Sequence, residues 1–317
     1  MFYREAQKIL VGEAASFGQE VVPLELGFGR VLCERIVADR DYPPFNRAAM
    51  DGFAFRYKDF EKGQREFIIN ETIFAGQVPA TTLAEGQCYK IMTGAATPED
   101  ANVIVRREDT NEGQAKVSML IDTIKPGQNI AKRGEDLGHG AVIIDGPVVA
   151  TPAVISLLAA VGKDSVKVQR LPRVAVITTG SEVIPVDQPV SEVQIRNSNA
   201  WLLKALLHKQ GIIPFSVKHM PDDRAQLQKA FSEVLDADII ISCGGVSAGD
   251  ADFVPDAVEA LGVKKLFHKL MIRPGKPIWC GKLPGKGMLF ALPGNPLSCL
   301  VTFTLFVRPY QIGRAHV

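Results

Sequence analysis

Apolar residues in the N-terminal half of the chain follow first a helical period and then a strand period. Residues 4–15 have apolar side chains at helical spacing, which predicts an amphipathic helix. The tandem prolines of residues 41–46, DYPPFN, predict an extended connector. Residues 55–125 contain short alternating apolar runs between turn residues, which predicts a small β domain. Residues 151–160 predict a second helix, because Pro152 suits its first turn. The strands expected in the β domain cover residues 67–69, 88–91, 103–105 and 117–121.

The pattern changes at Leu171 and Pro172, after which strand and helix periods alternate. Strands separated by helices pair in parallel through right-handed crossovers, so residues 171–310 are predicted to form a three-layer α/β domain. In such a domain, ligands bind beyond the carboxyl ends of the strands. The expected strands cover residues 174–177, 213–218 and 239–241, and the expected helices cover residues 200–209, 223–235 and 297–307.

The composition limits the classes of partner and the cellular location. Lys and Arg (36) exceed Asp and Glu (35) by one, and this balance favours neither nucleic acid nor a membrane surface as a partner. The five cysteines are scattered without a C-x-x-C pair, which argues against a zinc site and suits a reducing compartment. No signal peptide and no membrane-spanning stretch are evident, so we expect a cytoplasmic protein. A binding site for an anion must then depend on a local group of residues rather than on the net charge of the chain.

The most informative segment, DIIISCGGVSAGDADF, runs from a buried apolar strand into a glycine-rich loop. Gly244 and Gly245 let the backbone approach a ligand closely and offer N–H groups to an anion. Ser247 adds a hydroxyl, and Asp250 and Asp252 can hold a divalent cation or accept protons. A glycine-rich turn without a ligand would explain the glycine pair alone. The serine and the two carboxylates instead favour a phosphorylated ligand such as a nucleotide.

A second loop, TTGSE, directly follows the expected strand at residues 174–177. The hydroxyls of Thr179 and Ser181, together with Gly180, suit a phosphate or a ribose at a strand-to-helix turn, and Glu182 adds a carboxylate. The loop matches neither a P-loop nor the G-x-G-x-x-G pattern. A plain helix N-cap at Ser181 is therefore an equal alternative.

The segment KLMIRPGKP places three cations around a Pro-Gly turn: Lys269, Arg273 and Lys276. An arginine can offer two parallel hydrogen bonds to an oxyanion. Basic residues in a turn are also common where they are simply solvated. The position after another expected strand favours the anion site.

The segment LPGNPLS combines a stiff turn with the start of a helix. Asn295 is the expected N-cap, with Pro293 before it and Pro296 at the first helical position. Ser298 then lies in the first turn, where free N–H groups attract anions. A turn that only ends a strand and begins a helix is the alternative.

Three short segments of the N-terminal half place polar residues beside glycine. They are AAMDGFA with Asp51, TGA with Thr93, and KRGED with Asp136. Read alone, Asp51 suits a turn and the KRGED run suits a solvated loop.

Taken together and in order, these segments resemble the MoeA family of molybdenum insertases, which is related to the gephyrin E domain. The resemblance implies an elongated homodimer with a helical domain I (1–54 and 126–170), a small β domain II (55–125) and an α/β molybdopterin-binding domain III (171–310). A C-terminal β-barrel domain IV normally follows and is missing here. Residues 311–317 match one translation of a common sequencing adapter, so we expect read-through at this end. The matching motifs are PPFNRAAMDGFA (43–54), TGA (93–95), RGED (133–136), TTGSE (178–182), SCGGVSAGDADF (242–253), RPGKP (273–277) and LPGNPLSC (292–299).

The resemblance implies the last step of molybdenum cofactor synthesis. Adenylylated molybdopterin and molybdate react, with Mg²⁺ present, to give molybdenum cofactor and AMP. It implies catalytic roles for Asp51, Thr93, Asp136 and Glu182, and Mg²⁺ ligation by Asp250 and Asp252. It implies ligand binding by Thr179, Gly180, Ser181, Gly244, Gly245, Ser247, Lys269, Arg273, Lys276, Pro293, Pro296 and Ser298. Within that set, Arg273, Lys276 and Ser298 would hold molybdate.

Two positions depart from the family pattern. Arg273 stands where lysine is frequent, which changes the donor geometry toward molybdate. Ser181 replaces the usual acidic residue after TTG.

Three other classes of protein share parts of this pattern. Molybdopterin adenylyltransferases share the domain III fold and perform the preceding step, but they are single-domain proteins; a transient contact with one of them is expected. CinA-like nucleotide hydrolases usually have a Gly-Pro-Thr element that is not found after Gly245. A gephyrin-like scaffold would need a linker that this sequence does not show.

Overall fold

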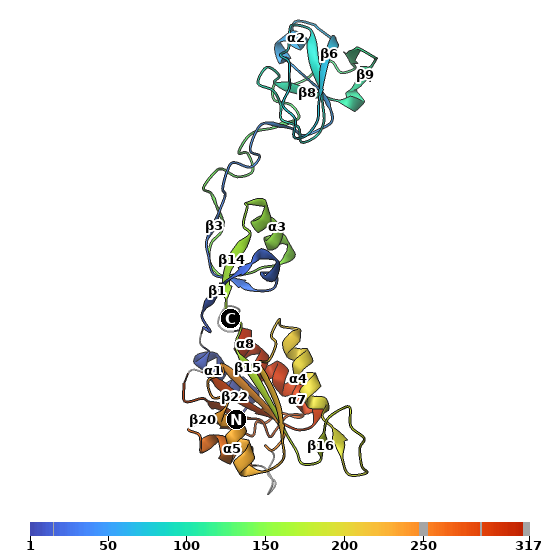
Figure 1. Cartoon of the computed structure of the whole chain (residues 1–317). Coiled ribbons are helices and arrows are strands. Elements are labelled where there is room, and N and C mark those ends of the chain that lie inside the picture. Colours follow the sequence, from blue (N-terminus) through green and yellow to red (C-terminus); the bar gives the residue numbers. More distant parts are fainter. Residues whose placement is uncertain (15, 247–252, 286, 313–317) are drawn as a thin grey trace. The chain divides into compact units, whose positions relative to one another are not determined.

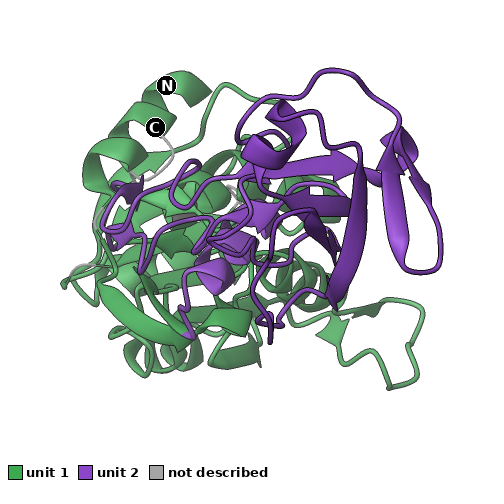
Figure 2. Ribbon diagram, turned by 90° about the horizontal axis from the view of Figure 1, so that it is seen from above, with its two compact units in different colours: residues 1–33, 147–150, 165–317 green, residues 34–146, 151–164 purple. Residues whose placement is uncertain are grey.

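The computed structural model describes residues 1–14, 16–246, 253–285 and 287–312, and the chain divides into two compact units (Figures 1 and 2). The first unit comprises residues 1–33, 147–150 and 165–317, and the second comprises residues 34–146 and 151–164. The chain therefore leaves the first unit after Cys33 and returns to it twice. Among the described residues, no helix is long and apolar enough to span a bilayer.

The first unit contains a six-stranded sheet in the order β18-β15-β19-β22-β21-β20. Strands β18, β15, β19 and β22 run parallel, whereas β21 is antiparallel to both of its neighbours. The strands are β15 (Val174–Thr179), β18 (Ser216–Met220), β19 (Ile239–Cys243), β20 (Lys264–His268), β21 (Trp279–Lys282) and β22 (Met288–Leu292).

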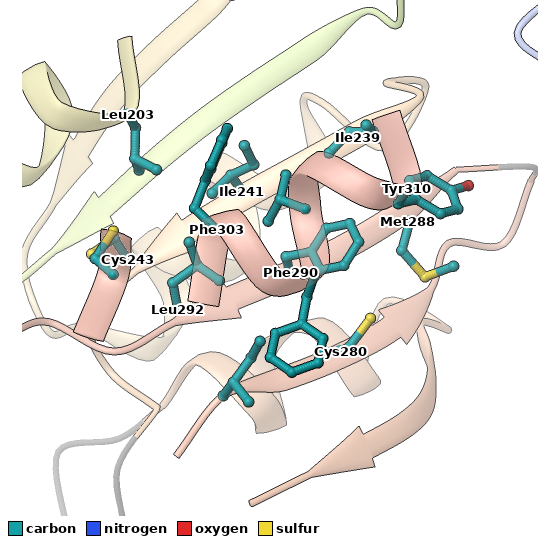
Figure 3. Close-up of a cluster of buried hydrophobic side chains, with 14 of the residues drawn as sticks. Leu203, Ile239, Ile241, Cys243, Cys280, Met288, Phe290, Leu292, Phe303 and Tyr310 are labelled. Atoms are coloured by element: carbon teal, nitrogen blue, oxygen red, sulfur yellow. The ribbon is translucent and has the colours of Figure 1, made fainter. Parts of the chain in front are cut away.

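Helices cover both faces of this sheet, because alternate side chains of the buried strands point to opposite sides. Val176 packs with Leu203 of α4 on one face, and Ile177 packs with Phe231 of α5 on the other. Figure 3 shows part of the first of these cores. The three-layer α/β domain that the sequence predicts is therefore confirmed. The first face carries α1 (Tyr3–Glu13), α4 (Ser198–His208), α7 (Pro296–Thr302), the π-helical η3 (Phe303–Val307) and α8 (Arg308–Ile312), and the second carries α5 (Arg224–Ser232) and α6 (Val254–Glu259).

Several elements differ in extent from the expected ones. Strand β18 begins at Ser216 rather than at residue 213, because Pro214 has no N–H to donate and Ile213 is 80% exposed. The single helix expected over residues 297–307 is divided into α7 and η3. The hydroxyl of Thr302 donates to the carbonyl of Ser298 (2.7 Å), and this competition for backbone acceptors accompanies the change from α to π geometry.

A smaller antiparallel sheet, in the order β1-β14-β2-β13, completes the first unit. Its strands come from both of the segments expected to form the helical domain I. These segments therefore contain short strands as well as the helices α1 and α3 (Pro152–Ala160). The strands of this sheet are β1 (Gln19–Pro23), β2 (Val31–Leu32), β13 (Val148–Val149) and β14 (Ser165–Gln169), with the 3₁₀ turn η1 (Leu24–Leu26) after β1. Strands β16 (Val183–Ile184) and β17 (Ile195–Arg196) pair beyond the large sheet.

The second unit is built around a six-stranded sheet in the order β8-β5-β7-β6-β10-β9, which confirms the β structure expected there. Buried side chains fill both of its faces, and the rings of Phe55 and Phe67 stack with centroids 4.3 Å apart. Its strands are β5 (Gly52–Phe55), β6 (Glu66–Ile73), β7 (Gln87–Ile91), β8 (Val103–Arg106), β9 (Thr110–Glu112) and β10 (Lys116–Met119). The remaining elements are the pairs β3 (Ile36–Val37) with β12 (Val142–Ile144) and β4 (Arg47–Ala48) with β11 (Ile130–Ala131), and the helical turns α2 (Tyr57–Glu61) and η2 (Arg107–Asp109).

The core of the large sheet predicts the effect of a truncation in β22. Phe290 is fully buried and its ring lies 5.7 Å from that of Tyr310 (Figure 3). We expect Phe290→Ala to lower the free energy of unfolding by about 3–5 kcal/mol, because it leaves a cavity in a packed core. Both tryptophans, Trp201 and Trp279, lie in the first unit, so urea unfolding followed by tryptophan fluorescence reports on this unit. Phe28→Ala, at a side chain that is 63% exposed, is the control, and equal losses in the two variants would contradict the assignment of the core.

Candidate functional site

A cavity of about 650 Å³ lies at the carboxyl ends of β15, β19 and β22 in the first unit. Its wall includes the three turns that follow these strands, the residues that begin α4, parts of β16 and β17, and also Asp222 and Pro277. Of the residues that the sequence singles out, those lining the cavity are Thr179, Gly180, Glu182, Gly244, Gly245, Pro293, Pro296 and Ser298. Three of the four loops considered for an anion site therefore meet in one place.

The turn after β15 is held by contacts within the first unit. Gly180 has φ +136°, and a Cβ built there would lie 3.1 Å from a carboxylate oxygen of Glu182, so this residue and the Glu182 side chain lie against each other. Ser181 is not among the cavity-lining residues. Its N–H donates to the carboxylate of Asp222 (3.1 Å), and its Oγ accepts from the N–H of Asp222 (3.1 Å). The helix N-cap at Ser181 that the sequence left open is wrong, because a short strand, β16, follows this turn.

The Gly244–Gly245 turn after β19 requires residues without side chains. Gly244 has φ +100°, and a Cβ built on it would lie 2.6 Å from Oγ1 and 2.8 Å from the carbonyl oxygen of Thr179. Gly245 has φ +65° and is almost as close to the same hydroxyl. The close approach of these glycines to Thr179 brings the turns after β15 and β19 together at the cavity wall. Ser247, Asp250 and Asp252 lie outside the described residues.

The turn after β22 begins α7 as the sequence predicts. The side-chain oxygen of Asn295 accepts from the N–H groups of Leu297 (3.1 Å) and Ser298 (3.3 Å), so Asn295 is confirmed as the N-cap. Pro296 occupies the first helical position, where the N–H it lacks would have no helical partner. Ser298 is buried beside the cavity.

The basic segment lies apart from the cavity lining. Lys269, Arg273 and Lys276 are exposed, and none of them has an ion-pair partner within the described ranges. They are not among the residues that line the cavity, although Pro277, the neighbour of Lys276, is. These cations are therefore available to a ligand that extends beyond the cavity described here.

Sequence reasoning missed five polar residues of the cavity wall: Arg196, Asn197, Ser198, Asn199 and Asp222. Asn197 caps α4 by accepting from the N–H of Ala200 (3.1 Å), and an asparagine just before a predicted helix is an N-cap signal that would have identified it. Asp222 had no such signal, because it reaches the cavity only through the pairing of β18 with β15.

Asp51 and Thr93 are in direct contact in the second unit. Oδ1 of Asp51 accepts from the hydroxyl (2.6 Å) and from the N–H (2.7 Å) of Thr93. These bonds, with a smaller contribution from the charge of Arg107, hold the pKa of the Asp51 carboxyl below its usual value. The exposed carboxylate is therefore ionised at neutral pH and oriented by Thr93.

The RGED segment is fixed in the same unit through backbone and side-chain contacts. The N–H of Asp136 donates to the carbonyl of Tyr42 (3.0 Å), and Nε of Arg133 donates to Oδ2 of Asp41 (2.7 Å). Strand β4 pairs with β11, which places the residues after Asn46 beside those before Lys132. The side chain of Asp136 is exposed.

Neither a thiol nucleophile nor a cluster of metal ligands is found in the described part of the cavity. Cys243 lines the cavity, but the contact of its thiol with Cys299 and its burial raise its pKa well above the usual value, so the thiol stays neutral. Among the described residues, no group of three or more His, Cys, Asp or Glu side chains is placed to hold a metal ion.

The fold and the cavity define a class of protein: an α/β domain with its ligand site at the strand ends, joined to a second unit with a β-sheet. Residues 175–311 match a family described as a probable molybdopterin binding domain. Residues 1–162 match a family described as the MoeA N-terminal region, domains I and II.

Relatives of known name extend this match over most of the chain. A molybdopterin molybdenumtransferase from Bacillus subtilis is 39% identical over 301 residues, which cover 92% of this chain and 69% of the relative. One from Staphylococcus aureus is 36% identical over 311 residues, covering 96% of this chain and 74% of the relative. The crystal structure of a molybdopterin biosynthesis MoeA protein from Pyrococcus horikoshii superposes with a TM-score of 0.79 at 31% identity, covering 99% of this chain and 80% of that protein. The chain belongs to the MoeA family, which confirms the resemblance seen in its motifs.

The packing of Gly244 against Thr179 gives a direct prediction. We expect Gly244→Ala to lower the free energy of unfolding by about 1–3 kcal/mol, because the new Cβ is strained at positive φ and overlaps Thr179. Gly285→Ala is the control, since a Cβ there meets no atom within 4 Å. Urea unfolding followed by tryptophan fluorescence compares the two, and a Gly244→Ala variant as stable as the control would refute the close contact.

The contact between Asp51 and Thr93 gives a second prediction. Thr93→Val removes the hydroxyl that contributes most to lowering the pKa of Asp51, so we expect this pKa to rise toward its usual value. Because the depressed pKa favours the ionised carboxylate, any stability from this contact is present at neutral pH and is lost as the pH falls through that pKa. Carboxyl ¹³C NMR titration measures the change. Thr97→Val, at a hydroxyl without a partner in the described structure, should leave Asp51 unaltered.

Proposed function

We propose that this protein transfers molybdenum from molybdate to adenylylated molybdopterin, releasing AMP and forming molybdenum cofactor. The observation that supports this most directly is the position of the cavity, at the strand ends of the segment that matches a molybdopterin binding domain. Its volume of about 650 Å³ is in the range of small-molecule sites. The relatives from Bacillus subtilis and Staphylococcus aureus are named for this transfer.

The turns after β15 and β19 would bind the phosphate groups of the adenylate. Thr179 and the glycines Gly180, Gly244 and Gly245 form a wall with little side-chain bulk, where a phosphate group can approach the backbone closely. Ser181 would act indirectly, because its contact with Asp222 orients this turn. The dithiolene chemistry belongs to the pterin, and the protein supplies binding and orientation.

The turn after β22 and the basic segment would bind molybdate. Ser298 lies at the cavity wall near Pro293 and Pro296, and the exposed Lys269, Arg273 and Lys276 are not engaged by carboxylates in the described structure. Molybdate is a tetrahedral dianion, so hydroxyl, guanidinium and ammonium donors suit it as they suit phosphate. The second substrate would thus bind beside the first.

Mg²⁺ fits the carboxylates of this site. Glu182 and Asp222 line the cavity, and Mg²⁺ in proteins is often held by one or two carboxylates together with phosphate oxygens. Asp250 and Asp252, outside the described residues, are further candidate ligands. A bound Mg²⁺ would neutralise phosphate charge at this point.

Asp51, Thr93 and Asp136 belong to the other unit, and we propose that they act on the adenylate in a homodimer. Asp51 is ionised and oriented by Thr93, which suits a carboxylate that positions a water molecule during hydrolysis of the adenylate. The reaction would take place in the cytoplasm, after a molybdopterin adenylyltransferase has supplied the substrate through a transient contact.

A reconstituted assay tests this proposal. Wild-type protein is incubated with adenylylated molybdopterin, molybdate and Mg²⁺, and we expect AMP release together with activation of a cofactor-free molybdenum enzyme. Arg273→Ala should raise the KM for molybdate about tenfold, as expected when a charge-assisted hydrogen bond is lost. Arg224→Ala removes an exposed arginine that does not line the cavity and is the control. In a parallel incubation with molybdopterin, ATP and Mg²⁺, adenylylation by a protein that transfers no molybdenum in the first assay would show the preceding step instead.

A further inference from the structure

The residues that begin α4 connect two walls of the cavity. Nδ2 of Asn197 donates to Oγ1 of Thr178 (2.8 Å), at the end of β15. Nδ2 of Asn199 donates to the carbonyl oxygen of Gly294 (2.6 Å), in the turn after β22. Strands β15 and β22 are not neighbours, because β19 lies between them. The start of α4 therefore bridges the two outer strands across the end of the middle one.

These contacts close a ring around the cavity. Gly244, at the end of β19, donates its N–H to the carbonyl of Leu292 (3.1 Å), and a Cβ built on Gly294 would lie 3.7 Å from the Cα of Gly244. On its other side Gly244 packs against Thr179. The ring thus passes from β15 through α4 to the turn after β22, and returns through Gly244.

The start of α4 is anchored in the core, so it can fix the distance between the turns after β15 and β22. Leu203 and Leu207 of α4 are fully buried in the core beneath, together with Val176 of β15. Asn199 lines the cavity, but its Oδ1 is itself buried and its Nδ2 is engaged by Gly294, so in this structure the amide acts on the cavity wall through that bond. Asn199 is therefore suited to positioning the neighbouring wall rather than to contacting substrate.

We infer that Asn199 is a positioning residue that fixes the separation of the two substrates. This inference rests on the proposed function, in which the turns after β15 and β19 bind the adenylate and the turn after β22 helps to bind molybdate. Loss of the Asn199–Gly294 bond frees the turn that carries Ser298 to move relative to the adenylate wall. Each wall keeps its own binding groups, but the two bound substrates no longer meet in the reactive geometry.

The inference separates binding from reaction rate. For Asn199→Ala we expect the Kd of AMP and the Kd of molybdate, each measured alone by calorimetry, to stay within about twofold of wild type. We expect kcat for molybdenum transfer to fall about 10- to 100-fold, the size of effect that misplacement by about 1 Å produces. If Asn199 contacted a substrate, its removal would instead raise the Kd of that one ligand by a similar factor.

A matched control removes a comparable bond at the other end of the same helix. Nε2 of Gln210 donates to the carbonyl of Leu206 (3.0 Å), so Gln210→Ala loses an amide-to-carbonyl bond away from the cavity. It should keep the wild-type kcat. Asn199→Ser is assayed in parallel, because serine is well tolerated at a helix start and its hydroxyl is too short to replace the amide. Circular dichroism shows whether each variant is folded. If Asn199→Ala does not fold, the kcat of Asn199→Ser decides the test.

The outcomes distinguish this inference from the proposed function. A wild-type protein that releases no AMP and forms no cofactor contradicts the proposed function itself. An active wild type with an Asn199 variant of unchanged kcat contradicts only the positioning role. A loss of kcat matched by an equal loss of affinity for AMP or molybdate alone also overturns it, since Asn199 would then act at a single substrate.

Discussion

Parallel pairing in register brings the ends of β15, β19 and β22 to one edge of the large sheet, and the candidate site depends on this. Thr178 of β15 pairs with Cys243 of β19, which in turn pairs with Leu292 of β22. β19 and β22 end at this paired level and β15 ends one residue later, at Thr179, so three turns far apart in the sequence become neighbours. A shift of one residue in either pairing would turn buried side chains toward the wrong face, so the packing of both cores maintains this register.

The same constraint explains why small residues occur where they do. The middle turn lies between two others, and a Cβ on Gly244 would overlap Thr179. Polar side chains that can contact a ligand therefore come from the outer turns, from the start of α4 and from the residues after β18, where Glu182, Ser298, Ser198 and Asp222 line the cavity. The middle turn offers backbone, which suits an anion, while the outer ones offer hydroxyl, amide and carboxylate groups.

The parallel part of the sheet and the turns at its edge could be predicted from sequence because they depend on local patterns, whereas the antiparallel pairing of β21 with β20 and β22 could not. Each of these patterns can be recognised within a few residues: a buried β-branched run, a Gly-Gly pair after a strand, and an Asn-Pro helix start. Asp222 could not be found in this way, since its contact with Ser181 joins residues 41 positions apart. The role of Ser181 changed for the same reason: its partner is a carboxylate brought near by the pairing of β15 with β18. Asn199 could have been noted beside an N-cap, but its bond to Gly294 depends on how α4 crosses the sheet.

Charge distribution adds a second condition for the proposed reaction. Adenylate and molybdate are both anions, so bringing them together requires positive charge at the meeting point, while the chain as a whole has a net charge of only +1. In the first unit many charged side chains are paired, such as Arg170 with Asp238 and Lys282 with Glu13. The segment with Lys269, Arg273 and Lys276 differs, because its cations form no ion pair in the described structure. At the cavity wall Glu182 and Asp222 place two negative charges beside the single positive charge of Arg196, and a divalent cation bound between carboxylate and phosphate would offset the remaining repulsion. A nearly neutral protein can thus favour two anionic substrates, provided that its unpaired cations face one of them and its carboxylates recruit a metal ion for the other.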